Sequence, residues 1–178
     1  MRRVVLVIVA LFALTLGGVV ALASIQPDEF RVTRTVRINA TPDRVYPLIN
    51  DLRGWQSWSP YEKKDPAMKR TFGNVTAGKG ASYEWDGDSN VGKGRMEIAE
   101  TVPPSKVVID LHFMKPFEGR STAEFLISQN GPPTDVTWTM HGPAQFITKI
   151  MCVFFDMDKM IGPDFEVGLA NLKTIAEK

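Results

Sequence analysis

Few residues in this chain have the types and spacing that catalysis or metal binding requires. The chain contains two histidines, His112 and His141, and a single cysteine, Cys152. Both histidines fall on the outward-facing side of predicted strands and have no third partner at ligand spacing, so we expect no metal site. Cys152 lies in an apolar stretch, where a thiol behaves as a small hydrophobe and not as a nucleophile. We therefore predict no catalytic residue, no bound metal and no cofactor.

Two other segments carry chemistry-bearing side chains without a complete pattern. Residues 73–79, GNVTAGK, match the start of a phosphate-binding loop. That motif needs Ser or Thr at the next position and a helix after it, but Gly80 stands there and a strand pattern follows. We interpret the segment as a hairpin turn. Asp156 and Asp158 could form an acid pair at the mouth of a pocket, although solvated charges on an apolar segment are the simpler interpretation.

Charge and length exclude one class of partner. The chain has 178 residues, with 21 Lys and Arg against 20 Asp and Glu. Without residues 1–23, which contain Arg2 and Arg3, the rest holds 19 basic and 20 acidic side chains, a formal charge of −1. Nucleic-acid binding depends on surplus Lys and Arg that neutralise phosphates. We therefore expect no nucleic-acid partner, and one soluble domain after the apolar leader.

Residues 4–23 form this leader, an uncharged apolar run. As a helix it would be about 30 Å long, enough to cross the hydrocarbon core of a bilayer. Arg2 and Arg3 should stay cytoplasmic, which places the following domain outside the cytoplasm, in the periplasm of a bacterium. We favour this single-pass anchor because the run exceeds the usual signal-peptide core of about 7–15 residues. The alternative is a secreted protein cleaved after Ala23, since residues 21–23 fit the small-x-small pattern.

The remaining sequence predicts an α+β domain. Residues 30–39 alternate apolar and polar side chains with the period of a half-buried strand. Thr41-Pro42 predicts a helix start, with Pro at the first helical position. Residues 73–140 form short alternating runs broken by Gly, Pro, Asn and Asp, which predicts an antiparallel meander with one apolar face. Gly162-Pro163 predicts the start of a terminal amphipathic helix over 163–177 that covers this face.

Four strings fall at matching places in this element order: VRINATPDRVY (36–46), WQSWSP (55–60), VTWTM (136–140) and DFEVGLANLK (164–173). With them, the chain resembles the polyketide cyclase/dehydrase and lipid-transport family of the START-like (SRPBCC) superfamily. The resemblance implies a helix-grip fold, in which a curved antiparallel sheet wraps a long C-terminal helix. It also implies an apolar cavity for lipids, polyketides or other hydrophobic ligands, and it carries over no catalytic residue.

Aromatic and Met side chains gather on the inward positions of the predicted strands, on the turn after the first helix and on the terminal helix. Ligand cavities are mostly apolar, and Met suits adaptable apolar surfaces. As a set, these side chains favour a ligand cavity over a filled core. The predicted ligand-binding residues are Trp55, Trp58, Trp85, Met96, Phe113, Phe125, Trp138, Met140 and Phe165.

Residues 144–161 are apolar on nearly every side. A helix with one buried face needs fewer apolar side chains than this segment has, so some of them should be exposed. It could contact ligand, or the bilayer that the leader holds nearby. The other interpretation is a helix packed between the sheet and the terminal helix.

These observations divide the chain into an anchor or signal peptide over 1–23, a linker over 24–29 and a helix-grip ligand-binding domain over 30–178. The leading hypothesis is that this domain binds a hydrophobic small molecule, lipid-like or polyketide-like, without catalysis. The membrane is a further partner, through residues 4–23 and through 144–161 if that segment reaches the bilayer.

Two alternatives stay open. One is an enzyme of the cyclase, dehydrase or hydrolase type acting on an apolar substrate, with Arg34, Tyr83 or Glu97 as polar groups. Arg34 falls on the apolar side of the first strand, where a long side chain can reach solvent from a sheet end. The other is an accessory protein with a filled core, which would contain no internal space.

Overall fold

The structure is a computed structural model that describes the chain except for Met1, Gln129 and Gln145. Met1 and Gln145 belong to the predicted segments 1–23 and 144–161 and lie outside the described residues. The elements, in chain order, are α1 (Arg2–Ser24), β1 (Glu29–Ile38), α2 (Pro42–Asn50), the 3-10 helix η1 (Leu52–Gly54), α3 (Trp55–Trp58), α4 (Pro60–Lys64), β2 (Lys69–Phe72), β3 (Ser82–Asp86), β4 (Lys93–Val102), β5 (Lys106–Lys115), β6 (Gly119–Ile127), β7 (Thr134–Pro143), α5 (Phe146–Phe154) and α6 (Met157–Ala176).

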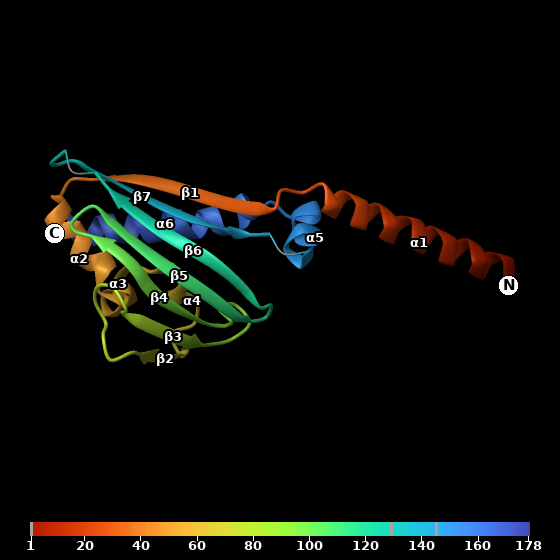
Figure 1. Cartoon of the computed structure of the whole chain (residues 1–178), viewed down its shortest axis with the longest axis horizontal. Coiled ribbons are helices and arrows are strands. Elements are labelled where there is room, and N and C mark those ends of the chain that lie inside the picture. The colour runs from red at the N-terminus through yellow and green to blue at the C-terminus, as the bar shows by residue number, and fades with distance from the viewer. Residues whose placement is uncertain (1, 129, 145) are drawn as a thin grey trace.

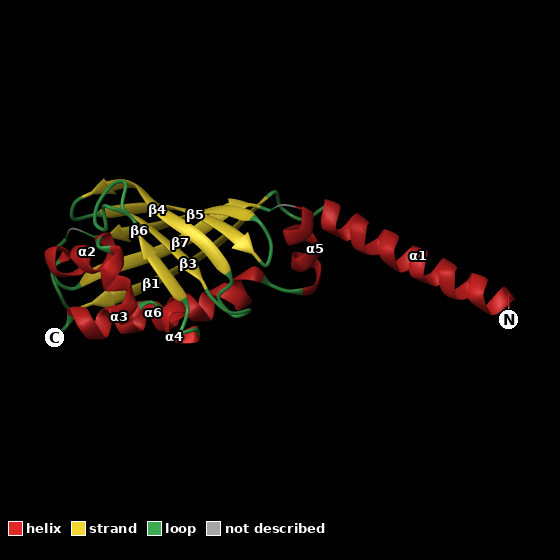
Figure 2. Cartoon of the chain, turned by 90° about the horizontal axis from the view of Figure 1, so that it is seen from below, coloured by secondary structure: helices red, strands yellow, loops and turns green. Residues whose placement is uncertain are grey.

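The strands build one antiparallel sheet in the order β1-β7-β6-β5-β4-β3-β2. Strands β2 to β7 follow one another as a meander, and β7 returns to pair with β1, where Val32 lies opposite Met140. The connection from β1 to β2 contains the helices α2 to α4. The sheet curves over α6, which lies along one face (Figures 1 and 2). This architecture confirms the predicted α+β helix-grip fold.

One face of the sheet packs against α6 because the strands alternate inward apolar and outward polar side chains. On β7, Val136 and Trp138 are buried, whereas Thr137 between them is only half-buried. From the other side, α6 buries Phe165 and Leu169. Burying a side chain of this size stabilises a fold by about 1.5–3 kcal/mol. The same face of the sheet also forms the site described below.

The prediction that the terminal helix starts at Gly162-Pro163 is wrong, because α6 begins at Met157 and contains Pro163. Asp156 caps this earlier start: its carboxylate accepts hydrogen bonds from the backbone N–H groups of Asp158 and Lys159, at 2.9 and 3.4 Å. Such a cap satisfies N–H groups that have no partner within the helix. The interpretation of Asp156 and Asp158 as merely solvated charges is therefore incomplete.

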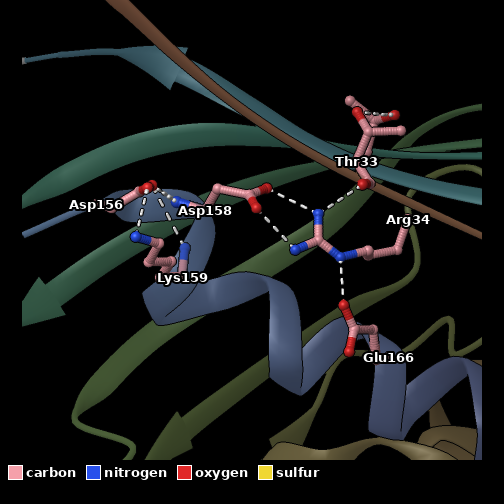
Figure 3. A network of polar contacts seen from close by, with 7 residues as sticks. Thr33, Arg34, Asp156, Asp158, Lys159 and Glu166 are labelled. Atoms are coloured by element: carbon pink, nitrogen blue, oxygen red, sulfur yellow. Dashed lines mark hydrogen bonds and ion pairs between the residues drawn. The ribbon is translucent and has the colours of Figure 1, made fainter.

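Gly162 has a packing role that its helix-start pattern concealed. A Cβ atom at this position would overlap the guanidinium of Arg34 on β1. That guanidinium donates to Asp158 and Glu166, both on α6, at 2.7 Å each. Figure 3 shows it lying between these carboxylates, beside the helix. The absence of a side chain at Gly162 thus lets β1 approach α6.

The interpretation of residues 144–161 as a helix packed between the sheet and the terminal helix is also wrong. Most of this segment forms α5, which lies beyond the end of the sheet and beside the C-terminal end of α1 (Figure 1), and residues 157–161 form the first turn of α6. None of the described residues of α5 is buried. An ion pair between Lys149 and Asp28 ties α5 to the segment that leads into β1. Phe146, Ile147 and Phe154 of α5 are exposed, and its other apolar side chains are half-buried.

The apolar helix α1 extends away from the sheet (Figure 1). Its mean hydropathy reaches 2.9 over an 18-residue window, and none of that window is buried. It is long and apolar enough to cross a membrane, and a signal sequence would have the same features. Ala23, near its end, is fully buried.

Two local details add to or differ from the sequence-based expectations, and a third agrees with them. The meander begins earlier than predicted, with the four-residue strand β2. The first predicted helix ends at Asn50, and its N-cap residue Thr41 makes no side-chain cap. The phosphate-loop-like segment connects β2 to β3 without a helix, and Gly78 and Gly80 adopt positive φ angles of 76° and 84° there. The last observation confirms that this segment is a turn.

Candidate ligand-binding cavity

A cavity of about 310 Å³ lies between the inner face of the sheet and α6. Its walls come from α3, α4, strands β3 to β7 and the first half of α6. Seven of the nine predicted ligand-binding residues line it: Trp55, Trp85, Met96, Phe113, Trp138, Met140 and Phe165.

The other two predicted residues, Trp58 and Phe125, lie behind this wall. Both are fully buried, and neither lines the cavity. The Trp58 ring packs against Trp55 with centroids 4.7 Å apart, and Phe125 stacks on Trp138 at 5.0 Å. They therefore support the residues that face the cavity.

Two indoles, Trp55 in the wall and Trp58 behind it, are fixed by hydrogen bonds to the end of α2. The Nε1 atoms of Trp55 and Trp58 donate to the backbone carbonyls of Ile49 and Leu48, at 2.8 and 2.9 Å. These carbonyls belong to the last turn of a helix, where carbonyls lack intrahelical partners. The sequence WQSW after α2 thus both ends the helix and orients the aromatic wall.

Of the three indoles that line the cavity, Trp85 donates to the carbonyl of Val91 at 3.1 Å, whereas Trp138 has no such bond to a described residue. Trp138 is 3% exposed, and among the described residues its Nε1 atom has no hydrogen-bond acceptor. A buried donor without a partner destabilises a fold by about 1–3 kcal/mol. Such a group is unusual in a filled core and more typical of a binding site.

A polar group, Glu62 with Tyr83, interrupts the apolar wall. Glu62 is 8% exposed, and its Oε1 atom accepts the Tyr83 hydroxyl proton at 2.7 Å. Its Oε2 atom accepts from Nε of Arg70 at 2.6 Å. Burial and the adjacent Glu62 carboxylate raise the pKa of Tyr83 above its usual range. Tyr83 therefore remains a neutral hydroxyl at physiological pH.

The solvent side of the cavity carries a second polar group. Lys64 on α4 and Asp164 on α6 both line the cavity and form an ion pair at 2.6 Å. Tyr61 lies beside them, and burial followed by the nearby Asp164 charge raises its pKa. Each cavity-lining tyrosine thus has a carboxylate next to it.

Of the three polar groups considered for an enzyme, only Tyr83 lines the cavity. Arg34 does not line it and is bound to Asp158 and Glu166 (Figure 3). Glu97 points to the outer face of β4, where it pairs with Arg95 at 2.8 Å.

The metal and nucleophile candidates also lie outside the cavity. His112 faces outward and contacts Glu118 at 3.3 Å, and His141 is half-buried on the outer face of β7. The thiol of Cys152, on α5, has its pKa raised by burial and by Asp156. Within the described part of the chain, no group of three or more potential ligands could hold a metal ion.

The sequence analysis missed the polar residues of the cavity, chiefly Glu62 and Asp164. Glu62 occupies a helix, α4, of only five residues, and its partner Tyr83 is 21 positions away. No periodic pattern could pair them. The available local signal was the WQSWSP string, whose two tryptophans were predicted on the turn after the first helix, just before Glu62.

Comparisons with known proteins agree with this geometry. The family model described as polyketide cyclase / dehydrase and lipid transport matches residues 29–177. No curated protein matches the chain.

Several solved structures share the fold. Protein CV1439 from Chromobacterium violaceum has a TM-score of 0.59 and 16% identity, over 86% of this chain and 99% of that one. The Aha1 dimer from Colwellia psychrerythraea has a TM-score of 0.59 and 15% identity, over 83% of this chain and 96% of that one. The di-domain ARO/CYC BexL has a TM-score of 0.60 and 15% identity, over 89% of this chain and 53% of that one.

At these identities the solved structures show the fold alone, whereas the family model matches nearly the whole sequence that follows α1. The fold, the cavity and this match agree with one another. The chain belongs to the polyketide cyclase/dehydrase and lipid transport family.

Proposed function

We propose that this protein binds a hydrophobic small molecule, lipid-like or polyketide-like, in the cavity between the sheet and α6. The observation that carries the proposal is the cavity of about 310 Å³ with a largely apolar wall that contains aromatic and Met side chains. Protein interiors are close-packed and contain few voids larger than a water molecule. The volume lies at the lower end of the range typical of small-molecule sites, about 300–1,000 Å³.

Two further features support binding over the alternative of a filled core. Among the described residues, the buried Nε1 donor of Trp138, a residue of the cavity wall, has no hydrogen-bond acceptor, which is unusual in a filled core. The family description includes lipid transport, and the similar protein BexL comes from a biosynthetic pathway. Both cavity tyrosines have raised pKa values and stay protonated, and the Tyr83 hydroxyl donates a hydrogen bond to Glu62.

We propose that α1 remains attached as a single membrane span and holds the domain outside the cytoplasm. Arg2 and Arg3 precede the apolar run, and basic residues favour the cytoplasmic side. The bond after Ala23 lies within α1, and Ala23 itself is fully buried. Cleavage there would therefore break a packed helix end.

The position of α5 supports a second contact with the same bilayer. It packs beside the end of α1 (Figure 1), which is where a span would leave the hydrocarbon core. Its large apolar side chains include Phe146, Phe154 and the adjacent Phe155, which are 54%, 62% and 57% exposed. An exposed apolar helix face of this kind binds the interfacial region of a bilayer.

Tryptophan fluorescence can test the proposed binding, because three of the four tryptophans line the cavity and the fourth packs behind it. The full chain would be held in amphipol and titrated with bromodecane, whose bromine quenches indoles on contact. We expect saturable quenching, because α1 contains no tryptophan and probe dissolved around it stays silent.

Charged variants give the matched control for this titration. Met140→Glu places a carboxylate in the cavity wall, whereas His141→Glu places one on the opposite face of β7. We expect quenching to be lost in the first variant and kept in the second. Unchanged quenching in a folded Met140→Glu variant would contradict binding at this cavity.

A further inference from the structure

The polar groups of the cavity favour one ligand charge over another. Glu62 and Tyr83 are 8% and 4% exposed, and both line the cavity. Tyr83 donates its only hydroxyl proton to Glu62, so its oxygen is left as an acceptor. The Glu62 carboxylate carries acceptors only. Together they offer hydrogen-bond acceptors to whatever occupies the adjacent space.

The cation next to Glu62 is not available to a ligand. Arg70 does not line the cavity. Its Nε atom donates to Glu62 at 2.6 Å, and its Nη1 atom donates to the backbone carbonyls of Met68 and Pro66 at 2.7 and 3.2 Å. A ligand carboxylate at this place would therefore meet the charge of Glu62 without a compensating donor from Arg70.

The solvent side of the cavity has the same character. Lys64 is the one cationic side chain among the described lining residues, and Asp164 neutralises it at 2.6 Å. The Tyr61 hydroxyl is a possible donor, but it lies within the field of Asp164. An anion would thus find the one lining cation already paired with a carboxylate, whereas a neutral hydroxyl can both donate and accept.

From this arrangement we infer that the cavity selects apolar ligands with a neutral hydroxyl group, such as long-chain or polycyclic alcohols, and rejects the corresponding carboxylates. The inference rests on the proposed function and specifies its ligand class. The physical reason is that a desolvated, unpaired charge strongly disfavours binding. A hydroxyl keeps its hydrogen bonds in the same place.

The test compares ω-bromodecanol, ω-bromodecanoate and bromodecane as quenchers of the full chain in amphipol at neutral pH, where the acid is ionised. We expect ω-bromodecanol to reach half-maximal quenching at a concentration at least roughly 10-fold lower than ω-bromodecanoate, and lower than bromodecane. Equal or stronger quenching by ω-bromodecanoate, or equal quenching by bromodecane, would overturn the selectivity. Absence of quenching by all three would instead overturn the proposed function.

A charge-removing variant tests the residue that carries the inference. Glu62→Gln removes the carboxylate and leaves Arg70 without its partner, so we expect the affinity for ω-bromodecanoate to rise. The gain should be confined to ω-bromodecanoate, whereas a variant that had lost its packing would expose apolar surface and bind all three probes more strongly. The matched control is Glu97→Gln, which removes an exposed carboxylate on the outer face of the sheet. An unchanged preference in folded Glu62→Gln, or an equal change in the control, would overturn the role of Glu62.

Discussion

Trp138 on β7 and Phe165 on α6 stack face to face, with ring centroids 3.9 Å apart and planes inclined by 7°. This pair joins the sheet to the helix that it wraps, and both rings line the cavity. The stack therefore belongs to the core and to the site at once. Its removal should affect stability as well as binding.

The first prediction follows from this pair. Phe165 is 1% exposed, and truncating a buried Phe to Ala destabilises a protein by about 3–5 kcal/mol. We expect Phe165→Ala to lower the free energy of unfolding by this amount, as measured by denaturant titration of the full chain in amphipol. Val167→Ala, at a 51% exposed position on the same helix, should change it by less than about 0.5 kcal/mol. A similar small effect of both variants would contradict the account of this core.

The second prediction concerns the contact between Gly162 and Arg34. In a helix interior, Ala is more favourable than Gly by about 1 kcal/mol. In the wild-type background, Gly162→Ala should displace the Arg34 guanidinium from Asp158 and Glu166. The lost ion pairs should cancel the stabilisation expected from Ala. In an Arg34→Ala background the gain should appear in full. Thermal unfolding of all four proteins measures the coupling, and additive effects would show that the contact is unimportant.

The third prediction is a dependence on pH. Hydrogen bonds from Arg34 lower the pKa of Asp158 below its ordinary value of 3.8. A carboxyl group with a lowered pKa stabilises the folded state above its ordinary pKa, and this contribution disappears as the pH falls through the lower folded-state value. Wild type should therefore melt at a higher temperature than Asp158→Asn at neutral pH, and the difference should vanish in strong acid. A difference that persists in strong acid would exclude this ion pair as its source.

The sequence predicted the apolar framework of the fold, but it did not predict the polar contacts. Local periodicity indicates which face of a strand or helix is buried. The alternation along β7 and the helical spacing of Phe165 and Leu169 therefore predicted the sheet, the terminal helix and seven residues of the cavity. The start of α6 was predicted at the wrong residue because Gly162 does not mark a helix end. Its lack of a side chain leaves room for Arg34, which is far away in the sequence. Pairs such as Glu62 and Tyr83 join segments far apart in sequence, and no local pattern records them.

The fourth prediction concerns the position of α5. A nitroxide placed at residue 154 in a Cys152→Ser/Phe154→Cys chain should contact lipid after reconstitution into vesicles, since Phe154 is exposed beside the end of α1. Electron paramagnetic resonance would then show greater accessibility to oxygen than to a water-soluble nickel reagent.

The control for this measurement is a Cys152→Ser/Val75→Cys chain. Val75 is 49% exposed, in the loop that bonds to Leu52 just after α2. Figure 1 shows α2 at the end of the sheet remote from α1. A nitroxide there should remain accessible to the nickel reagent. Equal nickel accessibility at both positions would contradict a membrane contact by α5.

The central claim is that the cavity between the sheet and α6 holds a hydrophobic small molecule. Native mass spectrometry of the full chain, purified from its own host and released from amphipol in the gas phase, tests it most directly. The account predicts a stoichiometric adduct that organic extraction identifies as an apolar molecule, and that is absent from Met140→Glu and retained in His141→Glu. A protein that carries no adduct and takes up neither bromodecane nor ω-bromodecanol would contradict the claim.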